Sequence, residues 1–213
     1  MLYVLLSAEG VVARFPYSIT QLRIDHPDTS FGEAISGEAL AGFGVHPVVP
    51  ADPPTVSLIE RSVHADPLLV EGEWVQQWAI EALSIEDAKT VLKAAIEQRR
   101  DHAFRAGFTP STGPLAGKTL QVRDNDDRTN WLTSQASYSA AVVAGQGATM
   151  GAEFRTASNE TITCTYLQGL QTLLAMAAWG KAIMGNSWVL KDAAVAATDL
   201  AEVAAIDVAA GWP

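Results

Sequence analysis

The chain has 213 residues, of which 48% are hydrophobic and 18% are charged, a composition that excludes a disordered tail. Its formal net charge of −10 would repel the phosphates of a nucleic acid, so we expect no nucleic-acid partner. A single cysteine excludes a disulfide within the chain. The longest apolar run, at 173–179, is far shorter than the roughly 20 residues that cross a bilayer, so we expect no membrane insertion.

The N-terminal part of the chain has the pattern of small β structure. Apolar runs predict strands at 1–6 and 11–15, and further strands at 57–63 and 74–80 joined by a turn at 71–73. Trp74 and Trp78 share one face of the last strand, because successive side chains of a strand alternate between its faces. Several prolines between about residues 24 and 55 argue against long central strands there.

Helical spacing begins at Ser84, which can cap a helix with two acidic residues in its first turn. Apolar residues, among them Val91, Leu92 and Ile96, recur at three- and four-residue spacing as far as residue 104. Gly107 predicts the end of this helix. The helix is long enough to pack against copies of itself, and it marks the boundary between two halves of the chain.

The second half mixes strands and helices. We expect a strand at 118–123, a helix at about 128–144, and a β-hairpin at 153–165 in which threonine and isoleucine alternate. Helices are expected at about 167–184, apolar nearly all round and therefore buried, at 188–197, and at 198–205. The sequence thus predicts an α+β protein. It has a small β-rich N-terminal domain (1–83), a connecting helix (84–107) and a C-terminal α+β domain (108–213) with a β-hairpin and packed alanine-rich helices.

Motifs that carry chemistry are weak in this sequence. The segment 111–119 resembles a phosphate-binding loop, but only three residues separate Gly113 and Gly117 where that loop needs four. The acidic run 124–127 could surround a cation, although an acidic helix N-terminus is the simpler interpretation. The four histidines are scattered, and Cys164 lies within a predicted strand. We therefore expect no catalytic, cofactor-binding or metal-ligating residues.

Tryptophan is the residue type that exceeds expectation, with six in the chain. Tryptophans serve cores first and interfaces second, and the set fits a protein that buries surface in an assembly. The sequence analysis therefore proposes a protein–protein interface that includes Trp74, Trp78, Val91, Leu92, Ile96 and Trp212.

The C-terminal half resembles a family with a domain of unknown function that is common in tail proteins of tailed phages and prophages. The resemblance rests on residues 115–124, the helix entry at 128–131, the hairpin at 154–162, residues 190–194 and the ending at 200–213. It covers roughly residues 90–213, and short motifs at 25–31 and 74–78 extend it weakly into the first half. Members are often described as tail-fibre or tail-fibre-assembly proteins, with no catalytic residues to transfer.

The resemblance implies a structural component of a phage tail tip or fibre, in the host-attachment apparatus or baseplate of the virion. It further implies a homo-oligomer, with three copies matching the threefold symmetry of many fibres and the helix at 84–104 as its central bundle. Its partners would be other tail proteins, and it would reside in the host cytoplasm during assembly. The alternative is an assembly chaperone that helps a separate fibre fold and leaves. A third hypothesis, a hydrolase acting on surface polysaccharide, stays open because paired carboxylates cannot be selected without a cleft.

Overall fold

Strands dominate the first of the two units into which the chain folds, Met1–Ser84, in the computed structural model, which describes all residues 1–213. Its five-stranded sheet has the order β2-β1-β3-β5-β4. The strands are β1 (Leu2–Leu6), β2 (Val12–Tyr17), β3 (Val45–Val49), β4 (Glu60–Val70) and β5 (Glu73–Ala82). Neighbouring strands are antiparallel except β3 and β5, which are parallel.

The centre of this sheet was not predicted. β3 is the middle strand although it contains Pro47, and it pairs with β1 along four residues. Its pairing with β5 is confined to Val48 and Val49, so Pro47 has no partner residue on that side. A short strand can therefore accept a proline that would interrupt a long central one.

Two short helices, α1 (Ile19–Asp25) and α2 (Gly37–Gly42), were also missed. Each follows a serine cap: the Ser18 hydroxyl accepts the Gln21 N–H at 3.1 Å, and the Ser36 hydroxyl accepts the Ala39 N–H at 3.2 Å. Helices this short show no apolar periodicity, so only the caps could have indicated them. Side chains from α1, α2, β2 and β3 form the buried cluster Tyr17, Leu22, Leu40 and Val45.

The hairpin of β4 and β5 confirms the predicted turn. Glu71 and Gly72 both have positive φ, 51° and 87°, which is the backbone of the tight two-residue turn that matches strand twist. Both strands are longer than expected, and β4 is interrupted near Pro67, where the register with β5 shifts between Ala65 and Leu68. β4 therefore runs as two segments on either side of an irregularity.

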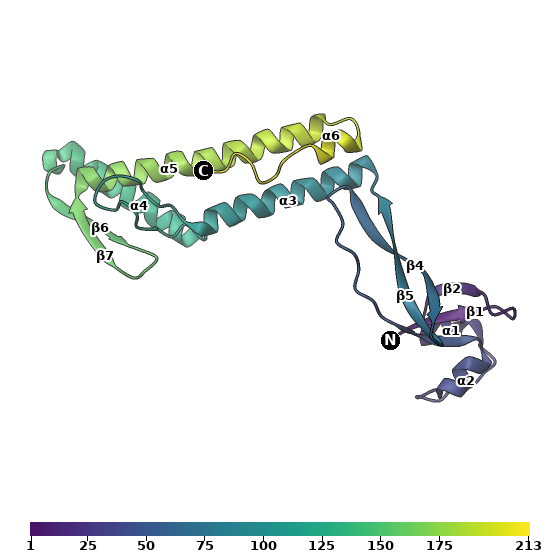
Figure 1. Ribbon diagram of the computed structural model, residues 1–213. Coiled ribbons are helices and arrows are strands. Elements are labelled where there is room, and N and C mark those ends of the chain that lie inside the picture. Colours follow the sequence, from purple (N-terminus) through teal and green to yellow (C-terminus); the bar gives the residue numbers. More distant parts are fainter. The chain divides into compact units, whose positions relative to one another are not determined.

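The second unit, Ile85–Pro213, is mainly helical. Its long helices α3 and α5 run side by side in opposite directions (Figure 1), linked by ion pairing of Lys191 Nζ with Glu97 at 2.6 Å. The elements are α3 (Ile85–Ala106), α4 (Asn125–Ala141), the short π-helical turn η1 (Val142–Gln146), β6 (Met150–Arg155), β7 (Thr161–Thr165), α5 (Tyr166–Ala196) and α6 (Leu200–Ala204). The α+β class and the predicted hairpin are confirmed.

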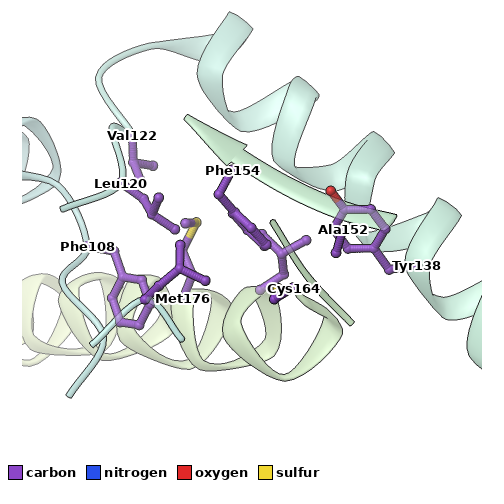
Figure 2. Packing of buried hydrophobic residues seen from close by; sticks show 10 residues of the cluster. Phe108, Leu120, Val122, Tyr138, Ala152, Phe154, Cys164 and Met176 are labelled. Atoms are coloured by element: carbon purple, nitrogen blue, oxygen red, sulfur yellow. The ribbon is translucent and has the colours of Figure 1, made fainter. Parts of the chain in front are cut away.

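The core of this unit lies between the β6–β7 hairpin, α4 and α5. Figure 2 shows Met176 of α5 beside Leu120 and Val122, with Phe154 of β6 and Cys164 of β7 further along the helix. Phe154 is 1% exposed, and its ring lies 5.7 Å from that of Trp131. The hairpin is therefore held to the helices by its buried aromatic side chain.

The predicted strand at 118–123 is wrong. This segment is extended, but it makes only one bridge, in which the backbones of Phe108 and Leu120 exchange hydrogen bonds of 2.9 and 2.8 Å. Leu120 and Val122 are buried in the core, so the apolar alternation reflects packing under the helices. Gly107 permits this approach, since a Cβ there would lie 2.7 Å from the Leu120 carbonyl oxygen.

The prediction of separate helices at 167–184 and 188–197 is also wrong, because α5 is one helix of 31 residues. Residues 185–187, which the two predicted helices left between them, are helical. The Asn186 amide donates to the carbonyl of Ala210 at 3.0 Å, and Ser187 is 1% exposed on the packed side. The burial all round that was predicted for 167–184 is wrong as well, because Leu167 and Leu174 are 44% and 50% exposed.

Candidate functional site

Trp78, one of the two tryptophans of β5, takes part in a polar and aromatic network inside the first unit. The Trp78 ring stacks on His64 at 4.5 Å, and its Nε1–H donates to the Ala51 carbonyl at 2.9 Å. Gln76, between Trp74 and Trp78 in the sequence, is only 4% exposed, and its Nε2 is 3.0 Å from Nδ1 of His64. Trp74 is half-buried beside a shallow hollow of about 370 Å³ at the N-terminus. The Trp78 ring is therefore engaged within the unit, whereas Trp74 is partly open to solvent.

The other proposed interface residues lie in the second unit with different exposure. Leu92 and Ile96 are fully buried on the side of α3 that packs within the chain, whereas Val91 is 39% exposed. Trp212 is half-buried; its Nε1–H donates to the Val208 carbonyl at 2.8 Å, and the Arg99 guanidinium lies 5.7 Å from its ring. Leu92 and Ile96 thus pack inside the chain, and the apolar side of α3 is already covered.

An apolar groove of about 640 Å³ lies in the second unit between α3, α4 and α5. Its floor consists of the buried core residues Val122, Leu173 and Met176. Two of its apolar lining residues are largely open to solvent: Leu132 of α4 is 66% exposed, and Trp188 of α5 is 57% exposed. Such exposed apolar surface around a concave floor is typical of a binding site.

Aromatic side chains form the walls of this groove. The Phe104 and Trp179 rings meet edge to face at 5.7 Å. Trp131 is fixed by a hydrogen bond from its Nε1–H to the Gln121 carbonyl at 2.7 Å and by stacking on Phe154. Side chains held in this way present rigid contact surfaces, which lose little entropy when a partner binds.

Cationic groups border the groove in a chain of net negative charge. The Arg128 guanidinium lies 4.9 Å from the centroid of the Phe104 ring, and Lys181 borders the groove from α5. Arg100 pairs with Asp101 at 2.7 Å, a partly exposed ion pair that contributes about 1 kcal/mol at most. The groove is therefore suited to an apolar segment that carries acidic residues.

The weak motifs of the sequence have structural roles. Gly117 donates its N–H to the Pro110 carbonyl at 2.9 Å, and Lys118 pairs with Glu160 at 2.6 Å, so the segment resembling a phosphate loop forms a turn with no helix after it. Asp124 caps α4 by accepting the Asp127 N–H at 2.9 Å. The hydrogen bond from Arg123 holds the pKa of the Asp127 carboxyl below its ordinary value.

Burial raises the pKa of the Cys164 thiol, which disfavours the thiolate. No three His, Cys, Asp or Glu side chains gather where they could hold a metal ion. No helix combines the length and the apolar character needed to span a membrane.

Sequence analysis missed Trp131, Trp179 and Trp188 as groove residues. It counted all six tryptophans but selected those at a strand face and at the C-terminus. Met184 and Trp188 lie four residues apart and share one side of α5. The predictions placed them in separate helices, at 167–184 and 188–197, so this shared side was not recognised.

A model of a family described as a domain of unknown function (DUF4376) matches residues 87–210, which lie within the second unit. No curated protein and no solved structure matches the chain.

Proposed function

We propose that this chain, which belongs to the DUF4376 family, is a structural component of a bacteriophage tail tip or fibre and acts by protein–protein assembly. The observation that carries the proposal is the open aromatic groove between α3, α4 and α5, whose form suits a protein segment. The assignment to a phage tail is supported by the resemblance at residues 115–124, 154–162 and 200–213.

In this proposal the groove binds an apolar segment of a neighbouring tail protein. Each Leu- or Met-sized side chain buried there would contribute about 1.5–3 kcal/mol, and the rigid tryptophans would act as anchors. Arg128 would face acidic residues beside the apolar ones. No covalent chemistry is needed for this role, so we propose that the protein is not an enzyme.

The location is tested by mass spectrometry of purified particles of a tailed phage that encodes this chain. We expect the chain in the virion in a fixed ratio to the tail proteins. If it is absent from particles but bound to unassembled fibre in infected cells, the structural role is refuted and the assembly-chaperone alternative takes its place.

The groove is tested in the same phage with two matched substitutions. Leu132→Asp places a carboxylate at an exposed apolar position of the groove, and Val143→Asp does so at an 86% exposed position outside it. We expect Leu132→Asp to lower incorporation into particles at least ~10-fold, because a charge would be buried against apolar surface, and Val143→Asp to have little effect. Equal incorporation of both variants would rule out the groove as the docking site.

A further inference from the structure

The solvent-exposed face of α5 has few charges for a helix in water. Only Lys181, Lys191 and Asp192 are charged among its 31 residues. Lys191 is paired with Glu97 of α3 at 2.6 Å, which leaves Lys181 and Asp192. Neither of these two forms an ion pair within the chain. Around them, Leu174, Val189 and Val195 are 50%, 66% and 62% exposed.

The spacing of the two remaining charges is specific. Lys181 and Asp192 are eleven residues apart, about three helical turns, so they lie on one face of α5 at a separation of about 16 Å. Their midpoint falls between Asn186 and Ser187, and the charges on its two sides are opposite. A second α5, antiparallel and related by a twofold axis at this midpoint, therefore places Lys181 opposite Asp192 of the partner subunit, and Asp192 opposite Lys181 of the partner subunit.

The same register matches the shapes along the face. Trp188, the largest exposed side chain of the helix, lies opposite Gly185 of the partner subunit. A Cβ added at Gly185 would meet nothing within 4 Å in the chain, so internal packing does not require a glycine there. Ala178 lies opposite Val195 of the partner subunit. In this register, each of these large side chains thus lies opposite a small residue of the partner subunit.

Other arrangements of this face bring like charges together. In a parallel pair, or in a parallel bundle of three, each Lys181 would meet Lys181 of the partner subunit at the same height. An antiparallel pair centred on Lys181 or on Asp192 would likewise place that residue opposite its copy in the partner subunit, with the same charge. Opposed like charges are destabilising, so the charges select both the antiparallel direction and the register.

We infer that two copies of this chain associate through α5, antiparallel and centred between Asn186 and Ser187, with two reciprocal ion pairs of Lys181 with Asp192. This inference does not rest on the proposed phage function. Because Lys181 and Trp188 also line the groove, the partner's α5 would lie at the groove's edge. A single pair of helices is a small interface, and we expect a dissociation constant on the order of micromolar.

The test is the molar mass of the purified full chain, by light scattering and sedimentation, from ~1 to ~100 µM, a range that spans this expected constant. We expect a concentration-dependent mass that reaches twice that of the chain. Lys181→Asp alone and Asp192→Lys alone should each weaken dimerisation about 10-fold or more, and the double variant Lys181→Asp/Asp192→Lys should restore it. Glu33→Lys, an exposed reversal of the same size in the first unit, is the control and should leave the dimer unchanged.

A second variant keeps the test independent of charge. Gly185→Leu should abolish dimerisation. Its thermal unfolding midpoint, compared with that of the unchanged chain at a dilute concentration where both are monomeric, should stay the same or rise, because the site is open within the chain. A monomer at every concentration, a mass of three chains, or a double charge reversal that fails to restore the dimer would overturn the inference.

Discussion

Two glycines of α5 allow the packing of the second unit to be tested with one and the same substitution. Gly169 is buried, and a Cβ added there would lie 2.5 Å from Cβ of Ala152 on β6 and 3.1 Å from the ring of Tyr138 on α4. Gly185, sixteen residues further along, faces open space. Glycine-to-alanine changes at the two positions share the helix and the chemistry and differ only in the neighbours that the new methyl group meets.

The expected effects have opposite signs. In a helix interior alanine is favoured over glycine by up to about 1 kcal/mol, so Gly185→Ala should raise the free energy of unfolding by about that amount. At Gly169 the same gain is opposed by a clash with Ala152. The Cβ of Ala152 cannot rotate away, so β6 itself must shift, and overpacking of this kind costs about 1–3 kcal/mol. Gly169→Ala should therefore lower the free energy of unfolding by up to about 2 kcal/mol.

The assay is urea unfolding of the full chain followed by far-ultraviolet circular dichroism. The long helices α3, α4 and α5 all belong to the second unit, so this signal reports mainly on that unit. All proteins are compared at one dilute concentration, because association would add to the apparent stability. If Gly169→Ala stabilises the unit as much as Gly185→Ala does, the close packing of α5 against β6 and α4 is refuted.

Two further predictions concern one polar contact in each unit. Burial, followed by a 2.7 Å hydrogen bond to Asp25, raises the pKa of Tyr17 to about 12. The stability that this shift contributes is complete below the ordinary pKa near 10 and is lost as the pH rises from 10 to 12. Tyr17→Phe should therefore reduce the fall in the free energy of unfolding that is measured across that pH range. Asp124→Ala removes the cap of α4 and should cost about 1 kcal/mol in urea unfolding, while Asp126→Ala, in the same first turn, should change stability by a few tenths at most.

The predictions from sequence were most accurate for elements whose conformation is determined by neighbouring residues in the chain. The turn at Glu71 and Gly72, the acidic start of α4 and the β6–β7 hairpin were all predicted, because turn conformation, helix capping and strand alternation depend on neighbours in the chain. The α+β class followed from these elements.

The predictions failed where contacts between residues far apart in the sequence determine the structure. Residues 118–123 alternate as a strand does, but no strand lies beside them, and Leu120 and Val122 pack under the helices instead. The predicted helices at 167–184 and 188–197 are one helix, in which the Asn186 amide donates to the Ala210 carbonyl of the C-terminal segment and Ser187 is buried. Single-sequence patterns cannot reveal such partners.

The groove illustrates the same limit. Trp131 and Trp179 come from different helices, and they line one groove because α4 and α5 pack on a shared core. Their sequence positions, far apart, contain no sign of this meeting.

The irregularity of β4 near Pro67 has a consequence for strand pairing at this end of the sheet. β4 ends the strand order, but it also lies beside β2 at the other end of that order, with the rings of His64 and Phe15 5.5 Å apart. Pro67 itself is buried, and Leu68 and Leu69 beyond it are each 58% exposed. The proline lacks an amide proton, and the register shift beside it prevents a flat, uninterrupted row of donors and acceptors. A second strand could therefore not pair with β4 along its whole length.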